Sequence, residues 1–445
     1  MTAAVPTGET HALPAADFAD HRRRLLERLP ADEAVLVFGG PVRPRNADSD
    51  HRYRPDSDVY WLTGWEDPEV AVFVRPGDEP LTMFVQPKDR EREVWDGRRP
   101  GPEGAREAFG ADAAYPIGEL EAQLPKLLQG VRALHYRFAV DPDHDALVAS
   151  SVARAARAAR ENGLTAPETF HHPSKLLHEL RLVKTPDELA VMRAAAALTA
   201  RGHRRAMAHT RPGLREFELE AEMVGLWRGA GSTGAGYTPI VAAGINATVL
   251  HYVTNRAVLQ EGELLLVDAG CEVDYYTADV TRTWPVSGTF TAPQRDLYGW
   301  VLRAQEAAID VCRPGRRFAE VHDAAVRVLT EGMIALGLLE GPLEERIADR
   351  SYKRYYMHGT SHWLGLDVHD AGSYGRDGAT RELAPDMVLT VEPGLYVDPD
   401  DDRAPEALRG LGIRIEDDVR VTDGDPEVLT AEIPKTVADI EAACR

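Results

Sequence analysis

The stretch that decides the fold spans residues 262–284 and reads GELLLVDAGCEVDYYTADVTRTW. Its apolar run at 264–267 ends at Asp268, and after a short polar turn a second β-prone segment carries Asp279. This pattern predicts a β-hairpin. A symmetric hairpin folded about residues 273–274 would place Asp268 directly opposite Asp279, with Cβ atoms roughly 4.5–5.5 Å apart.

Two directly opposed carboxylates repel each other, so such a pair requires compensation. A shared proton, a basic partner or bound cations would each supply it. A single aspartate at a strand end is more often a solvated residue, because aspartate is mostly exposed in folded proteins. The pair by itself therefore leaves these interpretations open, and residues further along the chain must decide between them.

Three residues downstream add further ligand chemistry. Glu392 ends the apolar strand in MVLTVEPG directly before Pro-Gly, as Asp268 ends its strand before Ala-Gly. Glu416 follows an alternating Ile-Arg-Ile, so it shares one strand face with Arg414. His362 lies in HGTSHWLGLDVHD. For each residue alone, solvation or an ordinary core contact is an alternative, but acids at the ends of three apolar strands are costly without cations.

The combined set offers four carboxylates and one imidazole: Asp268, Asp279, His362, Glu392 and Glu416. Two divalent cations would balance the four negative charges. Hard oxygen ligands with a single imidazole suit manganese, magnesium, cobalt or iron, whereas a zinc centre of the thiolate-rich kind would need cysteine ligands. Two metals roughly 3.5–4 Å apart are a common arrangement for hydrolysis by a shared hydroxide.

The first part of the chain predicts an α/β domain over residues 16–173, preceded by a flexible segment at 1–15. This prediction rests on an alternation of strand and helix patterns. The strand patterns lie at 34–38, 59–63, 70–74, 81–85 and 133–138, and the helical patterns lie at 17–29, 118–128 and 145–161.

A second domain is predicted over residues 174–445. Pro186 opens a long helix with Thr185 as its N-cap, and that helix runs to about His209. Further helical patterns lie at 216–228, 292–312 and 318–336. A GxGxxG match at 229–234 follows a helix, which is the wrong order for a dinucleotide site, so we interpret it as a loop.

The composition restricts the function classes. A net charge of −21 argues against a nucleic-acid partner or an anionic membrane surface. The three cysteines are widely spaced without a CxxC pair, which predicts neither a disulfide framework nor a structural zinc site and fits a reducing cytoplasm. We find no signal-peptide pattern and no apolar stretch long enough for a membrane span.

Several blocks together resemble one family, the Xaa-Pro aminopeptidases (aminopeptidase P). The blocks are LVDAGCEVDYYTADVTRTWPV, HGTSHWLGLDVHD, VLTVEPGLYV, GIRIEDDV, YRPDSDVYWLTGWEDPEV at 53–70 and EVWDGRRPG at 93–101. The family consists of pita-bread metallopeptidases related to methionine aminopeptidase and prolidase. The resemblance covers nearly the whole chain and implies an N-terminal α/β domain followed by a pita-bread catalytic domain.

The resemblance also implies roles for the five candidate ligands. Asp268 would bind one of two divalent metal ions, most simply manganese, while Asp279 and Glu416 would bridge both. His362 and Glu392 would complete the second site, and Glu392 would also take the proton of the attacking water. The implied substrates are peptides with proline at the second position, cleaved before that proline.

Accessory residues follow from the same resemblance. His251, His358 and His369 match histidines that bind substrate or carry protons, a suitable role because histidine titrates nearest neutrality. Arg414 and Asp48 resemble residues that hold His369. For each histidine alone, a core position is the alternative.

Trp95 resembles a residue that a neighbouring subunit contributes to the active-site rim, which implies a homo-oligomer, either a dimer or a tetramer. A tryptophan packed within its own domain is the alternative. Tyr396 matches a pocket position to which we assign no role.

Two other functions remain open from the sequence. A prolidase would use the same five ligands but accept only dipeptides. A pita-bread module that binds peptides without cleaving them would typically lack metal ligands, whereas this chain has kept all five. A methionine aminopeptidase would not need about 175 residues before its catalytic domain.

Overall fold

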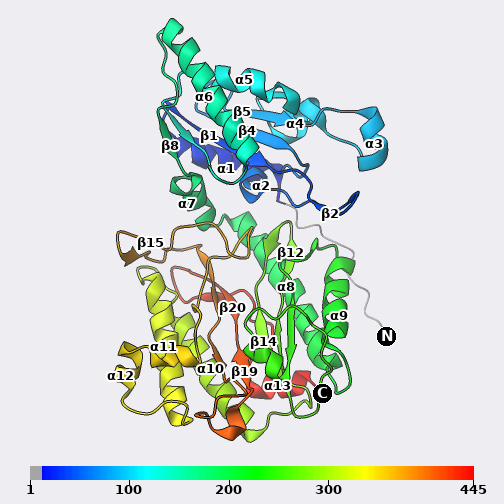
Figure 1. Ribbon diagram of the computed structural model, residues 1–445, viewed down its shortest axis with the longest axis vertical. Coiled ribbons are helices and arrows are strands. Elements are labelled where there is room, and N and C mark those ends of the chain that lie inside the picture. Colours follow the sequence, from blue (N-terminus) through cyan, green and yellow to red (C-terminus); the bar gives the residue numbers. More distant parts are fainter. Residues whose placement is uncertain (1–12) are drawn as a thin grey trace. The chain divides into compact units, whose positions relative to one another are not determined.

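The structure is a computed structural model that describes residues 13–445 (Figure 1). The described residues form two compact units, Leu13–Arg181 and Leu182–Arg445. The predicted boundary after residue 173 falls between β8 (Thr169–His171) and α7 (Leu177–Leu182), shortly before this division. Most of the predicted flexible start, residues 1–12, lies outside the described residues.

The Leu13–Arg181 unit is built on a mixed six-stranded sheet with the strand order β6-β5-β4-β1-β7-β8. Leu36, Phe73 and Phe84 are buried on this sheet together with residues of α5 and α6, which confirms the predicted α/β fold. Besides β8, the helices and strands of this unit are α1 (Ala15–Arg28), β1 (Glu33–Gly39), β2 (Pro44–Asn46), β3 (Ser49–Asp50), α2 (Ser57–Thr63), β4 (Val70–Val74), β5 (Leu81–Val85), α3 (Arg90–Asp96), α4 (Gly101–Phe109), β6 (Ala113–Pro116), α5 (Leu120–Leu127), β7 (Ala133–His135) and α6 (Pro142–Asn162).

One predicted strand of this unit is wrong, because residues 59–63 belong to helix α2. The side chain of Asp56 caps this helix by accepting hydrogen bonds from the backbone N–H groups of Asp58 and Val59 at 2.9 and 3.1 Å. Gly64 ends it in the left-handed conformation, with φ 71°. Periodicity cannot separate a short apolar strand from a buried helical turn, so the capping residues decided the outcome.

Helices flank the strands of the Leu182–Arg445 unit (Figure 1). The predicted N-cap of α8 is confirmed as a capping box, since Glu188 N donates to Thr185 Oγ1 at 3.1 Å and Thr185 N donates to Glu188 Oε2 at 2.6 Å. The helices are α8 (Pro186–His209), α9 (Glu216–Gly229), α10 (Ala292–Val311), α11 (Phe318–Ala335), α12 (Leu343–Ala348) and α13 (Val437–Ala443). The four long helices confirm the predicted ones to within one residue.

The first hairpin of this unit runs continuously from β11 (Leu264–Asp268) to β14 (Thr281–Pro285). Near its tip, β12 (Cys271–Val273) pairs with β13 (Tyr276–Thr277), and β10 (Ile240–Ala243) and β9 (Gly234–Ala235) pair with the outer edges of β11 and β12.

The hairpin is confirmed, but its predicted register is wrong by two residues. Asp268 lies opposite Thr281, so Asp279 is its diagonal neighbour and not its direct partner. The turn consists of Asp274 and Tyr275, with φ 45° and 65°, instead of residues 273–274. Two left-handed residues suit a two-residue hairpin turn, and the sequence offers no glycine there to mark it.

A second ribbon carries the other two acids. In it, β17 (Val388–Val391) pairs with β20 (Asp417–Arg420), and β18 (Gly394–Tyr396) pairs with β19 (Gly412–Arg414). Glu392 and Glu416 stand opposite each other at the step between the two pairs, since Val391 pairs with Asp417 and Gly394 with Arg414.

The two ribbons are joined where Glu416 N donates to Thr281 O at 3.0 Å. The remaining strands are short: β15 (Gly375–Arg376), β16 (Ala379–Thr380) and β21 (Glu427–Val428). Trp227, Trp284 and Ile413 belong to the large buried core between the ribbons and the helices.

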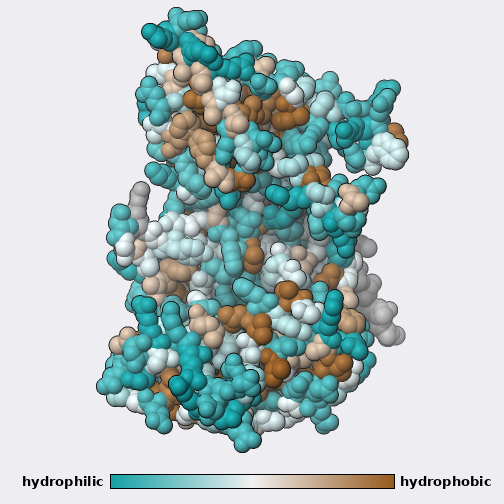
Figure 2. All heavy atoms as spheres, in the orientation of Figure 1, coloured by the Kyte–Doolittle hydropathy of each residue, from teal (hydrophilic) through white to brown (hydrophobic). Residues whose placement is uncertain are grey.

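Hydrophilic residues cover most of the face in Figure 2, as the net charge of −21 leads one to expect. Within residues 13–445, no helix has the length and apolar character needed to cross a membrane. Cys271, Cys312 and Cys444 are free thiols, and the first two are buried.

Candidate metal centre

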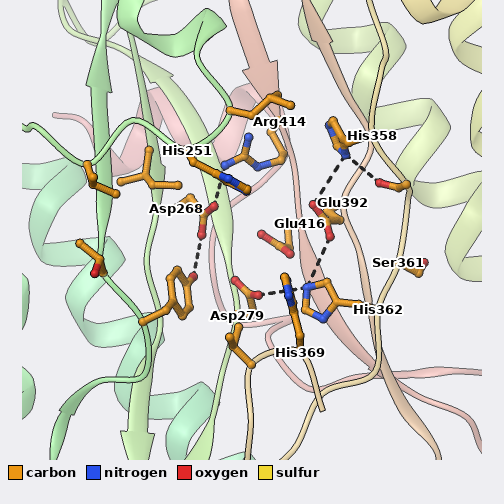
Figure 3. A pocket seen from close by; sticks show the side chains of 17 residues that line it. His251, Asp268, Asp279, His358, Ser361, His362, His369, Glu392, Arg414 and Glu416 are labelled. Atoms are coloured by element: carbon orange, nitrogen blue, oxygen red, sulfur yellow. Dashed lines mark hydrogen bonds and ion pairs between the residues drawn. The ribbon is translucent and has the colours of Figure 1, made fainter. Parts of the chain in front are cut away.

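A cavity of about 430 Å³ in the Leu182–Arg445 unit brings the predicted residues together (Figure 3). Its wall includes every metal-ligand and catalytic candidate named from the sequence: His251, Asp268, Asp279, His358, His362, His369, Glu392, Arg414 and Glu416. These residues come from β11, the end of the first hairpin, the two strands of the second ribbon and the loops beside them. The sequence therefore predicted the residues of one site although they are spread over more than 160 positions of the chain, from His251 to Glu416.

Three of the candidate ligands lie close enough to share a metal ion. One ligand atom each of Asp279, His362 and Glu416 fall within 4.8 Å of one another. His362 Nε2 lies 3.4 Å from Asp279 Oδ2 and 3.5 Å from Glu392 Oε1. Figure 3 shows the side chains of these residues pointing toward one common space, with Asp268 on its other side.

The position of His362 follows from backbone pairing with β17. Thr390 N donates to His362 O at 2.9 Å, and Glu392 N donates to Thr360 O at 2.8 Å. His362 is therefore opposite Thr390 and diagonal to Glu392, the same relation that links Asp268 to Asp279. Diagonal neighbours on one face reach each other only with long side chains, which leaves space between them.

Asp268 has protein partners of its own. It accepts hydrogen bonds from Tyr237 Oη and from Arg414 Nη2, both at 2.6 Å. Arg414 also donates to Thr281 Oγ1 at 2.9 Å and to Tyr396 Oη at 3.0 Å. A basic partner, one of the three compensations considered from the sequence, is thus present for one of the four acids.

The pKa values of three of the acids show that the basic groups present do not fully compensate the buried charge. Burial raises the pKa of Glu416 well above its ordinary value, and the charges of Asp279 and Glu392 raise it further. Burial likewise raises the pKa of Glu392 to about 7, and it raises that of Asp268 despite Arg414. Without cations the protein would have to hold protons here.

The imidazole of His362 responds to the same acids. Burial lowers its pKa, but the hydrogen bond and charge of Asp279 outweigh burial and raise it to about 9. A buried set of four carboxylates facing one arginine and one imidazole fits divalent cations, which would replace the protons. The donors are hard oxygens with one nitrogen, so the residues present fit a dinuclear divalent site.

A layer of hydrogen bonds orients the candidate ligands from behind. Thr281 Oγ1 donates to Glu416 Oε2 at 2.6 Å, and Thr390 Oγ1 donates to Glu392 Oε1 at 3.3 Å. His362 Nδ1 lies 3.0 Å from the carbonyl oxygen of Trp363, which leaves Nε2 toward the cavity, as is usual for metal-binding histidines.

Sequence reasoning missed this orienting layer, which also includes Asp418. Asp279 N lies 3.1 Å from Asp418 Oδ2. Asp418 could have been found, since it stands two residues after Glu416 on one strand face. Tyr237 carried no such signal.

The accessory histidines differ in their surroundings. His358 Nε2 lies 2.9 Å from Tyr396 Oη, and burial lowers the pKa of His358 to about 3. The rings of His369 and His362 have centroids 4.2 Å apart, and burial lowers the pKa of His369. His251 is an exposed residue of the wall.

Three other residues named from the sequence lie outside this wall. Tyr396 is buried behind it and connects His358 to Arg414. Asp48 and Trp95 are exposed residues of the Leu13–Arg181 unit. The expected contacts of Arg414 and Asp48 with His369 stay predictions.

Comparison with known protein families decides the family. The model described as metallopeptidase family M24 matches residues 190–423, more than half of the chain. The chain belongs to this family. A second model, described as the aminopeptidase P N-terminal domain, matches residues 18–135 of this M24 metallopeptidase. The expected order of an α/β domain followed by a pita-bread metallopeptidase domain is thereby confirmed.

Individual relatives are similar in sequence and structure to this M24 metallopeptidase along nearly its whole length. It is 41% identical to the Xaa-Pro aminopeptidase of Escherichia coli, covering 96% of this chain and 97% of the relative. The structure of Pseudomonas aeruginosa aminopeptidase PepP superposes with a TM-score of 0.94 at 44% identity, covering 97% and 98% of the two chains. A zinc-substituted Escherichia coli aminopeptidase P in complex with product superposes with a TM-score of 0.93 at 40% identity, with the same coverage.

Proposed function

We propose that this M24 metallopeptidase is an Xaa-Pro aminopeptidase, which removes the first residue from peptides whose second residue is proline. The observation that carries the proposal is the convergence of Asp268, Asp279, His362, Glu392 and Glu416 on one cavity. The similarity to the Escherichia coli Xaa-Pro aminopeptidase supports the substrate class, because nothing in the five side chains themselves encodes proline.

We assign Asp268 to one divalent ion, Asp279 and Glu416 to both, and His362 and Glu392 to the other. When bound, the two ions, manganese in our proposal, would lower the pKa of a water molecule and polarise the scissile carbonyl. The hard oxygen donors support manganese over a thiolate-preferring metal.

The protein's own groups carry the proton transfers. The carboxylate of Glu392, at the wall of the cavity, accepts the proton of the attacking water. His251, His358 and His369 line the space where the leaving proline nitrogen must gain a proton, and we assign them to substrate binding and proton transfer.

Arg414 holds one oxygen of Asp268 at 2.6 Å and Tyr396 Oη at 3.0 Å. It thereby fixes the carboxylate and, through Tyr396, His358. This assigns Arg414 and Tyr396 to orientation of the site.

The test measures cleavage of three kinds of peptide: Xaa-Pro-Yaa peptides, matched Xaa-Ala-Yaa peptides and Xaa-Pro dipeptides. The enzyme is first stripped of metal and then supplied with manganese, cobalt or zinc. We expect cleavage of Xaa-Pro-Yaa peptides, no cleavage of matched Xaa-Ala-Yaa peptides, and the greatest restoration by manganese. Activity confined to Xaa-Pro dipeptides would identify a prolidase. A protein that retains no metal and cleaves none of the peptides would instead be a binding module.

We also propose a homo-oligomer in which Trp95 reaches a neighbouring active site. The support is the exposure of α3, where 85% of Trp95 and 81% of Val94 are accessible to solvent. Light scattering of the wild type and of Trp95→Ala, with kcat/KM measured on both, tests this. A monomeric wild type, or a variant with unchanged oligomeric state and kcat/KM, would contradict it.

A cytoplasmic location completes the proposal, supported by three cysteines that form no disulfide. Fractionation of the source cells tests it.

A further inference from the structure

The Leu182–Arg445 unit contains a fully buried ion pair that the proposed chemistry does not use. Lys184 Nζ lies 2.8 Å from Asp370 Oδ2, and both side chains are only 1% exposed. Burying two charges is unfavourable unless they are paired, and apolar replacements of such pairs are often no less stable. A contribution to the free energy of unfolding is therefore not enough to explain why the chain has this buried pair.

Lys184 is anchored firmly on the backbone side. Its N–H donates to Asp386 O at 3.0 Å, two residues before β17 begins. The next residue, Thr185, is the N-cap of α8. The ammonium group thus projects from a point fixed by both a strand and a helix.

Asp370 closes the loop of residues 363–370. Its N–H donates to Trp363 O at 2.9 Å, and Thr277 N donates to Gly365 O at 3.0 Å from the first hairpin. A Cβ at Gly365 would collide with Asp370 Oδ2 and Lys184 Nζ, so the loop wraps closely around the ion pair.

This loop carries two residues of the cavity wall, Val368 and His369. His369 directly precedes Asp370, and its ring packs against that of His362 at 4.2 Å. Figure 3 shows His369 beside Asp279 and His362 at the edge of the cluster. Because the two residues are consecutive, holding Asp370 from inside the protein restricts the backbone that presents His369.

We infer that Lys184 and Asp370 are positioning residues that set His369 and Val368 at the wall of the catalytic cavity. Neither Lys184 nor Asp370 belongs to the wall of the cavity. The pair acts through the loop. The inference rests on the proposed aminopeptidase function, which gives His369 its task.

The central test compares Asp370→Ala with Asp370→Asn. The asparagine keeps the shape and an oxygen that accepts from Lys184, whereas alanine removes both. With an Xaa-Pro-Yaa peptide we expect Asp370→Ala to lower kcat at least tenfold with KM changed less than threefold, and Asp370→Asn to restore kcat to within threefold of the wild type. Manganese affinity, measured by calorimetry, should stay within threefold in both variants.

Arg354→Met is the matched control for Lys184→Met. Arg354 pairs with Asp401, whose side chain is 3% exposed and lies outside the cavity wall, so each variant removes the cationic partner of a buried aspartate. Both should lower the melting temperature, but only Lys184→Met should lower kcat. The inference is overturned if Asp370→Ala retains its kcat, or if Arg354→Met loses as much kcat as Lys184→Met.

A spectroscopic readout separates this inference from the proposed function. In metal-free enzyme with ¹⁵N-labelled histidine, the ring signal of His369, assigned through His369→Asn, should move in Asp370→Ala and stay in place in Asp370→Asn. If the wild type cleaves no Xaa-Pro peptide, the proposed function fails while this signal still tests the positioning. A His369 signal that stays in place in Asp370→Ala overturns the inference whatever the activity.

Discussion

Glu416 and Asp417 are consecutive, deeply buried acids at the start of one strand, yet their ionisation is driven in opposite directions. Glu416 faces the cavity and other carboxylates, and its pKa lies well above the ordinary value. Asp417 faces the core, where Arg282 and Lys435 outweigh burial and lower its pKa to about 2.

The contacts of the two carboxylates explain this difference. Asp417 accepts hydrogen bonds from Arg282 Nη2 at 2.6 Å, from Lys435 Nζ at 2.7 Å and from Gln305 Nε2 at 2.6 Å. Glu416 receives one hydroxyl hydrogen bond, from Thr281. Burial is common to both, so it is the supply of protein cations that distinguishes a structural acid from a metal-binding one.

The largest expected effect comes from removing Glu416. We expect Glu416→Ala to lower kcat/KM for an Xaa-Pro-Yaa peptide roughly a thousandfold, since metal ions contribute several kcal/mol to such reactions. Calorimetric titration with manganese should show weakened or lost binding. Unchanged metal stoichiometry and affinity would contradict the assignment of Glu416 to the metal centre.

Asp417→Asn addresses the other member of the comparison. It should lower the free energy of unfolding by about 3–5 kcal/mol, because Arg282 stays fully buried with its partner charge removed. Urea denaturation measures this. Asp425→Asn is the control, because Asp425 pairs with Arg313 while 92% exposed, and its replacement should leave stability nearly unchanged.

Thr281→Val sharpens the description of Glu416 by removing the hydroxyl that donates to it and that also accepts from Arg414 Nε. We expect manganese affinity to fall about 10–100-fold, as for other residues that orient metal ligands. Thr330→Val is the matched control, because Thr330 Oγ1 bonds to Val326 O within helix α11. Equal affinities of the two variants would show that the hydroxyl of Thr281 does not orient Glu416.

The smallest expected effect concerns pH in the metal-free enzyme. A raised pKa means that Glu392 contributes stability present below its ordinary value of 4.5 and lost as the pH rises through about 7. Glu392→Gln does not undergo this loss. Relative to the wild type it should therefore gain unfolding free energy between pH 4.5 and 8.

Glu427→Gln provides a control of opposite sign for the pH series. The hydrogen bonds from Arg193 and Arg420 lower the pKa of Glu427, so its contribution is present above 4.5 and lost as the pH falls. This variant should be less stable than the wild type at pH 7 and approach it in acid. If Glu392→Gln instead loses stability relative to the wild type as pH rises, the raised pKa of Glu392 is refuted. Urea denaturation at each pH measures both variants.

Local sequence patterns predicted much of the fold. The four long helices of the Leu182–Arg445 unit follow from apolar periodicity and N-terminal capping, which depend on neighbouring residues alone. The strand predicted at residues 59–63 failed because five apolar-rich residues fit either period, and only Asp56 and Gly64 marked the helix ends.

The candidate site was predictable where an acid ends an apolar strand. Asp268, Glu392 and Glu416 carried that signal, since burying them without partners would be costly. Tyr237, Lys184 and Asp370 carried none, because their contacts join segments from 31 to 186 residues apart.

The sequence by itself determined the donor chemistry, four hard carboxylates and one imidazole, because the identity of the side chains fixes which ions suit them. The tertiary structure decided which acids keep protein partners. Only the register about Asp274 and Tyr275 sets Asp279 diagonal to Asp268, and only the folded chain places Arg282 and Lys435 beside Asp417 and leaves Glu416 without them. Charge interactions depend on distance in space, which pairing across the fold creates and chain order does not reveal.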